Sequence, residues 1–372
     1  MVSFPDPRDR HPYHMHTMIL GQPAFVRRTL ERIARADVDG FLEERGRILF
    51  TGCGTSFHAA RYGARVLAEA LRGTRPVEAL HAYDLLQGSP VGRGDLVIGV
   101  SHSGNTPATN LALHRVRRRG ASVAAIAGLP DSPMAKIAHR ILVLGTAHDR
   151  SWANTMSYAT QLTALAWLAA RVGGSSWSGV RRTLLHVPER LVETLACERS
   201  VRRLAARVAR RRRVTFLGSG LDEITALEAA LKIRETCSLS ASGYHTEQFL
   251  HGPFLSLDRD DAIVALRSRE DGPRADWIFD GVRRASGFLA TIGDASEAEI
   301  RLPAVPPALR PIVSVVPMQF IAYYAALARR ANPDIMRSDV ARYQPGLELL
   351  FSWRPRPGPS GRPSRPRRRS GG

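Results

Sequence analysis

Short apolar runs alternate with segments of helical periodicity along most of the chain. In the first half the runs predict strands at 47–51, 76–80, 96–101, 122–127 and 140–144. In the second half they predict strands at 213–218, 262–266 and 287–292. Helices are expected between them, among others at 57–71, 107–119, 155–172, 222–236 and 312–330. This alternation favours parallel sheets joined by right-handed crossovers, so we expect an α/β fold.

The two halves of the pattern resemble each other. The segment LFTGCG at 49–54 recurs as TFLGSG at 215–220, and the offset of 166 residues is the size of a whole α/β unit. A Gly-Gly-Ser-Ser break at 173–176 ends the first unit. We therefore expect five segments: an N-terminal segment with a helix (1–46), a first unit (47–176), a helical connector (177–212), a second unit (213–353) and a tail (354–372). The tail contains only Pro, Gly, Ser and Arg after Arg354, so we expect it to be disordered.

Two glycine- and hydroxyl-rich loops follow strands of the first unit, at 52–56 (GCGTS) and 101–106 (SHSGNT). Such a loop before a helix suits a phosphate group, because glycine allows close approach and unpaired N–H groups and hydroxyls donate hydrogen bonds. Both loops belong at the carboxyl edge of a parallel sheet, where open α/β folds bind ligands. A dinucleotide-binding GxGxxG motif is the alternative, but residues 52–57 lack its third glycine.

At these loops the sequence resembles the SIS (sugar isomerase) domain family, in particular the isomerase half of glucosamine-6-phosphate synthases. GCGTS and the later S-x-S-G-x-T carry the resemblance, which extends over about residues 15 to 350. It implies two tandem doubly wound parallel-sheet units of the flavodoxin-like, three-layer αβα type. It also implies that the first unit binds a sugar phosphate through Thr55, Ser56, Ser101, His102, Ser103 and Thr106, with His102 where the synthases have glutamine.

The second unit carries the other part of the resemblance. Residues 230–235 read ALKIRE, and His251-Gly252-Pro253 begins sixteen residues after Glu235, as in the synthase family. The resemblance implies that Glu235 moves a proton between C1 and C2, that His251 opens the sugar ring and that Lys232 assists near O1. A surface ion pair is the alternative for Lys232 and Glu235, and a buried structural histidine is the alternative for His251. Only two lysines remain beside 51 arginines, which favours a function for Lys232 that arginine cannot perform.

Other positions depart from the synthase pattern. The family's C-terminal Leu-Ala-Lys, whose lysine forms a Schiff base with the sugar, corresponds here to Val340-Ala341-Arg342. Ala341 and Arg342 are candidate substrate-binding residues, but the guanidinium of Arg342 stays protonated and cannot form that imine. The loop at 267–272 after a strand of the second unit has one hydroxyl and two acids that offset its two arginines, so it is a poor phosphate site.

These features predict an enzyme that catalyses aldose–ketose isomerisation of a hexose or amino-hexose phosphate, coupled to deamination or amination at C2. Position 2 is Val where the synthases have their glutaminase cysteine, so we expect no glutaminase domain in this chain. The alternatives are an aminotransferase subunit served by a separate glutaminase and a sugar-phosphate sensor without turnover. In the family the histidine of His-Gly-Pro reaches the neighbouring subunit, which implies a homodimer.

Composition adds limits on partners and location. The net charge is +19, but seven arginines lie in 354–372, so the body carries about +12 and we do not expect specific nucleic-acid binding. Three cysteines, an odd number, indicate reduced thiols and a cytoplasmic protein. No apolar run approaches the length of a membrane span, so we expect no membrane partner. His14 and His16 have no nearby metal-ligand cluster, and we expect neither a metal nor a cofactor.

Overall fold

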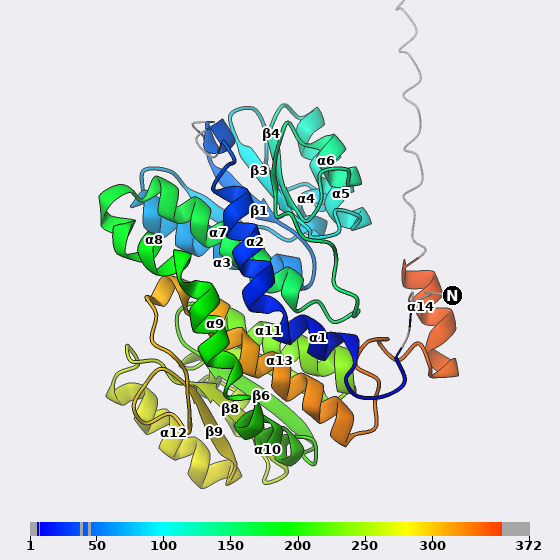
Figure 1. The fold of residues 1–372 in the computed structure, drawn as a ribbon, viewed down its shortest axis with the longest axis vertical. Coiled ribbons are helices and arrows are strands. Elements are labelled where there is room, and N and C mark those ends of the chain that lie inside the picture. The colour runs from blue at the N-terminus through cyan, green and yellow to red at the C-terminus, as the bar shows by residue number, and fades with distance from the viewer. Residues whose placement is uncertain (1–5, 7, 38–39, 44–45, 352–372) are drawn as a thin grey trace, which may run out of the picture.

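The computed structural model describes residues 6, 8–37, 40–43 and 46–351. It consists of two α/β units that lie one above the other in Figure 1, with helices between and beside them. Each unit contains a five-stranded parallel sheet, so the predicted fold class is confirmed. The predicted tail, residues 354–372, lies outside the described residues.

The first sheet has the strand order β2-β1-β3-β4-β5. Its strands are β1 (Ile48–Thr51), β2 (Val77–Ala79), β3 (Leu96–Val100), β4 (Ser122–Ala127) and β5 (Arg140–Val143). Its helices are α3 (Thr55–Leu71), α4 (Ala82–Gln87), α5 (Pro107–Arg118), α6 (Pro133–Ile137) and α7 (Met156–Val172). Alternate strand residues face opposite sides, so Leu49 and Val97 pack with α4, α5 and α6, whereas Ile48 and Ile98 pack with α3 and α7. Helices therefore cover both faces.

The second sheet repeats this topology with the order β10-β9-β8-β6-β7. Its strands are β6 (Arg213–Gly218), β7 (Ser240–His245), β8 (Asp261–Leu266), β9 (Leu289–Gly293) and β10 (Ile300–Arg301). Helix α12 (Pro273–Ser286) covers its outer face, and α11 (Asp222–Cys237) and α13 (Arg310–Ala328) cover the face toward the first unit. The sequence analysis missed β7 and β10, the two edge strands, because neither carries an apolar run.

Helices from both units form one continuous core, because α3 contacts both α7 and α11, and α13 contacts α11. The remaining helices surround it: α1 (His14–Leu20), α2 (Gln22–Ile33), α8 (Ser178–Leu185), α9 (Val187–Leu195) and α10 (Glu198–Val208). The expectation that no apolar run reaches membrane-span length was wrong. The helical segment at 307–328 is long and apolar enough to cross a membrane, since its most apolar window has a mean hydropathy of 1.5. However, 89% of that window is buried inside the protein. Its apolar character therefore belongs to the core.

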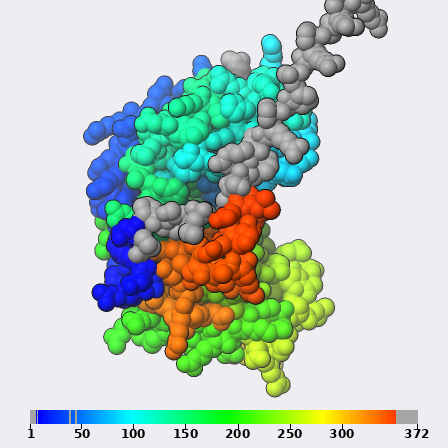
Figure 2. All heavy atoms as spheres, turned by 90° about the vertical axis from the view of Figure 1, so that its right-hand side faces the viewer, coloured from blue at the N-terminus to red at the C-terminus, as the bar shows by residue number. Residues whose placement is uncertain are grey.

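The N-terminal segment contacts the segment that follows α13. The Asp334 carboxylate accepts hydrogen bonds from the backbone N–H groups of His14 and Met15 at the start of α1. Asn332 donates to the carbonyl of Arg8 over 2.9 Å. Figure 2 shows the N-terminal residues and the C-terminal residues before 352, which end in α14 (Gln344–Phe351), on the same side of the molecule.

Candidate functional site

A cavity of about 200 Å³ lies where the first unit meets α11 of the second. In the first sheet the order of the strands reverses between β1 and β3, since β2 is added on one side of β1 and β3 on the other. Doubly wound sheets bind their ligands at this point. The loops after β1 and β3 form one wall of the cavity, the start of α7 forms another, and Glu235 on α11 lines it from the second unit. The lining residues are Cys53, Gly54, Thr55, Ser56, Ser101, His102, Ser103, Thr106, His148, Asn154, Ser157, Gln161 and Glu235.

The two loops are held in shape by close backbone approach and local hydrogen bonds. A side chain at Gly52 would meet the carbonyl of Val100 at 2.9 Å, so only glycine lets the two loops lie this close. Gly104 adopts φ +63° and donates its N–H to Oγ of Ser101 over 3.1 Å. Oγ of Ser101 also lies 3.2 Å from Oγ1 of Thr106. The predicted hydroxyls therefore converge beside the first turns of α3 and α5, where unpaired helical N–H groups favour an anion.

The start of α7 adds polar groups that the sequence analysis did not single out. Asp149 caps this helix by accepting from the N–H groups of Met156 and Ser157 and from the hydroxyl of Thr155. Among the described residues, three oxygens of the cavity wall are buried without a hydrogen-bond partner: Asn154 Oδ1, Ser157 Oγ and Gln161 Oε1. Buried polar atoms are normally satisfied, so this wall suits a ligand rich in hydroxyl groups.

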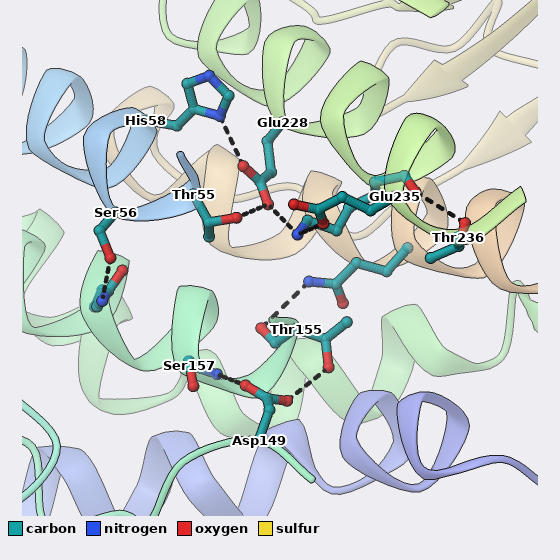
Figure 3. Close-up of polar contacts among 12 residues, drawn as sticks. Thr55, Ser56, His58, Asp149, Thr155, Ser157, Glu228, Glu235 and Thr236 are labelled. Carbon is teal, nitrogen blue, oxygen red and sulfur yellow. Dashed lines mark hydrogen bonds and ion pairs between the residues drawn. The ribbon is translucent and has the colours of Figure 1, made fainter. Parts of the chain in front are cut away.

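Helix α11 brings two carboxylates and an ammonium together, and Figure 3 labels the carboxylates, Glu228 and Glu235. The Lys232 side chain is completely buried, and its Nζ donates to Glu235 and lies 3.4 Å from Oε1 of Glu228. The surface ion pair considered for Lys232 and Glu235 is therefore wrong. Glu228 is also fully buried and accepts from Thr55 Oγ1 over 3.0 Å, and its other oxygen lies 2.7 Å from Nδ1 of His58.

Burial and the neighbouring charges set the ionisation of this cluster. Burial raises the pKa of Glu235, and the negative charge of Glu228 raises it further, although Lys232 opposes both. Burial also tends to raise the pKa of Glu228, but Lys232 and His58 outweigh burial, so that the pKa of Glu228 is lowered. The two carboxylates likewise overcome burial and raise the pKa of Lys232. Of the two carboxylates, that of Glu235 therefore accepts a proton more readily, and only Glu235 of this cluster lines the cavity. A general base needs both properties.

His102, in the loop at 101–106, has a buried side chain. Its Nε2 lies 3.0 Å from Oγ1 of Thr146, and its ring meets that of His148 edge-on at 5.7 Å between centroids. Burial lowers the pKa of His102 to about 4. The negative charge of Asp149 opposes this shift, whereas repulsion from His148 lowers the pKa further. His102 therefore supplies a polar edge without a positive charge at neutral pH.

The corresponding edge of the second sheet holds protein charges of its own. Arg310 donates to Asp222 over 2.7 Å and to Glu270, and Arg267 donates to Asp276 over 2.7 Å. Arg269 is paired with Asp294 at 3.0 Å. These arginines already have carboxylate partners, and that this edge is a poor phosphate site stays a prediction.

Besides Lys232, which lies behind Glu235, three predicted residues lie outside the cavity. His251 follows the short helix η3 (Gln248–Leu250), its side chain is 65% exposed, and Nε2 lies 3.9 Å from Glu247. The alternative of a buried structural histidine is therefore wrong. Ala341 and Arg342 lie in η6 (Ala341–Tyr343) on the surface, where Arg342 donates to the hydroxyl of Tyr343 over 3.3 Å.

Comparison with known proteins matches this architecture. The SIS domain model matches residues 41–171 and 208–280, more than half of the chain. A glutamine–fructose-6-phosphate aminotransferase (isomerizing) from Symbiobacterium thermophilum is 33% identical over 311 residues, covering 78% of this chain and 50% of that protein. The corresponding enzyme from Pyrococcus horikoshii is 30% identical over 306 residues, again 78% of this chain and 50% of that one. The chain thus spans about half the length of these curated relatives.

Solved structures agree with the fold. The C-terminal domain of glucosamine-fructose-6-phosphate aminotransferase from Francisella tularensis superposes with a TM-score of 0.80 at 21% identity, covering 88% of this chain and 99% of that one. Tagatose-6-phosphate ketose/aldose isomerase from Escherichia coli gives 0.73 at 22% identity, covering 89% and 97%. Tandem doubly wound sheets that share one hydroxyl-rich cavity define a protein built from sugar isomerase domains. The chain belongs to the SIS domain family, and the relatives named here are enzymes.

Proposed function

We propose that the protein binds a hexose or amino-hexose phosphate and catalyses its aldose–ketose isomerisation, coupled to deamination or amination at C2. One observation carries the proposal: a single cavity joins the hydroxyl loops of the first unit to the Glu235 carboxylate of the second. The printed activities of the aminotransferase relatives and of the ketose/aldose isomerase support the reaction class.

The proposed roles follow from the two sides of the cavity. Ser56, Ser101, Ser103 and Thr106 hold the phosphate beside the first turns of α3 and α5, and the polar wall of α7 binds sugar hydroxyls. Glu235 removes a proton from one of the two carbons C1 and C2 of the open chain and returns it to the other. The carboxylate is thereby regenerated at the end of the reaction.

His251 enters the proposal through a second copy of the chain. It is exposed and outside the cavity of its own subunit, which is consistent with a ring-opening role across a homodimer. Arg342 leaves the reaction without a Schiff base at that position, because its guanidinium stays protonated. This favours proton transfer together with the exchange of ammonia and water at C2, without a covalent enzyme–sugar link at that position.

A panel of fructose 6-phosphate, glucose 6-phosphate and glucosamine 6-phosphate tests the proposal, with ketose and ammonia as readouts. Glu235→Gln keeps the shape of the side chain but removes the base, so turnover should fall by about 10²–10⁴ while sugar-phosphate affinity stays near wild type. Glu193→Gln, at an exposed carboxylate on α9, is the matched control. Binding without turnover would favour a sensor, turnover only with ammonia or a glutaminase would favour an aminotransferase subunit, and an unimpaired Glu235→Gln would place the base elsewhere.

A further inference from the structure

A histidine behind the cavity joins the two units at the proposed catalytic helix. His58 lies in the first turn of α3, directly after the phosphate loop, and its Nδ1 is 2.7 Å from Oε2 of Glu228 on α11. His58 points at this carboxylate in Figure 3. Neither His58 nor Glu228 lines the cavity, so neither is placed to touch the substrate.

The charges of α11 require a partner for Glu228. Glu228 and Glu235 share a single ammonium, Lys232, and the three ionised groups sum to one negative charge in a largely buried site. Carboxylates in such a site need both a counter-charge and hydrogen bonds to remain ionised. His58 and Thr55 provide hydrogen bonds to Glu228, one to each of its oxygens. Lys232 can then lie closer to Glu235, and the structure has its shorter contact there.

We propose that His58 is a positioning residue, which through Glu228 holds Lys232 beside the base Glu235. The inference rests on the proposed function, because it concerns the same site. Without the His58 hydrogen bond, Glu228 draws the ammonium toward itself and Glu235 loses part of its counter-charge. The pKa of Glu235 then rises, so that the carboxylate becomes available as a base only at higher pH. Among the described residues, further ionisable groups near this array are Arg61 and Tyr62 on α3, Glu223 on α11 and Tyr158 on α7.

The test compares His58→Ala with His58→Asn, whose amide N–H can donate from about the position of Nδ1. For His58→Ala we expect kcat to fall about tenfold with KM within about twofold, and the ascending limb of the kcat–pH profile to move up by about one pH unit. His58→Asn should restore most of both. His114→Ala, at an exposed histidine on α5, is the control and should match wild type.

Carbon-13 NMR of the glutamate side-chain carboxyl groups provides a readout that needs no turnover. The signal that Glu235→Gln removes should titrate at higher pH in His58→Ala than in wild type. An unchanged titration overturns the positioning role whether or not the protein turns over any sugar phosphate. A wild-type protein without turnover but with the shifted titration would instead contradict the proposed function and leave the role of His58 intact.

A double variant covers the case in which His58→Ala folds poorly. Glu228→Gln removes the charge that His58 holds, so adding His58→Ala to it should move neither the titration of Glu235 nor the pH profile further. If the two substitutions instead add in full, His58 does not act through Glu228 and the proposal is wrong. Calorimetry with inorganic phosphate should give wild-type affinity for every His58 variant, because the phosphate loops keep their own contacts.

Discussion

Lys232 offers the sharpest test of the buried charge cluster. Lys232→Met keeps an unbranched side chain of similar length but removes the ammonium from between Glu228 and Glu235. Glu228 is then a fully buried carboxylate with hydrogen bonds but no cation within ion-pair distance on α11. Removing one partner of a buried ion pair costs about 3–5 kcal/mol, because the other charge stays behind. We expect the free energy of unfolding at pH 7 to fall by about this amount.

Urea unfolding followed by far-ultraviolet circular dichroism measures the effect. The chain's only other lysine, Lys136, is exposed at the end of α6, so Lys136→Met is a matched control that should change stability by less than about 0.5 kcal/mol. Adding Glu228→Gln to Lys232→Met should recover part of the loss, since one of the two uncompensated carboxylates is then neutral. A loss of less than about 1 kcal/mol in Lys232→Met would refute the reasoning.

The pH dependence gives this prediction a second signature. In the wild type the pKa of Glu228 is lowered, so its contribution to stability is present above its unfolded pKa and is lost as the pH falls through the folded value. In Lys232→Met both carboxylates lack the cation, and burial raises their folded pKa values above the unfolded ones. Stability is then lost as the pH rises, so the deficit of the variant should shrink between pH 7 and pH 5. An equal deficit at both pH values would contradict the electrostatic explanation.

Two further predictions concern the loop at 101–106, which we propose binds the phosphate. Ser101→Ala combined with Ser103→Ala should weaken sugar-phosphate binding in calorimetry by about 1.5–3 kcal/mol for each charge-assisted hydrogen bond lost, whereas Ser268→Ala in the second unit's loop should not change it. The pKa of His102 is lowered to about 4 by burial, so its contribution to stability is present above about pH 6.5 and lost as the pH falls toward 4. Between about pH 6.5 and 4, His102→Gln should therefore lose less unfolding free energy than the wild type, by up to about 1.4 kcal/mol per pH unit. Urea unfolding at pH 7, 5.5 and 4.5 measures this difference.

The sequence predicted those parts of the molecule that leave a local signal. The central strands are apolar runs such as Leu96–Val100, and all of these residues are buried. The edge strand β7 (Ser240–His245) has only one buried residue, Ala241, so its pattern of apolar residues does not indicate a strand. In the site, Lys232 and Glu235 were singled out by the resemblance of residues 230–235, with His-Gly-Pro sixteen residues later, to the synthase family. His58 and Glu228 are 170 residues apart, and nothing in the local sequence of either indicates the other.

The repeated architecture also explains why the second sheet does not repeat the hydroxyl loops of the first at its equivalent edge. The repeat that aligns 49–54 with 215–220 continues to Ser56 and Asp222, at the same offset of 166 residues. In the first unit Ser56 lines the open cavity and accepts a hydrogen bond from Gln161 over 3.1 Å. In the second unit Asp222 brings its own negative charge to the equivalent position, where Arg310 neutralises it over 2.7 Å. A second anion there would have to displace a buried ion pair, which is costly because the released charges lie away from water. Because the ion pair occupies that edge of the second sheet, the second unit contributes to the cavity of the first unit through Glu235 on α11.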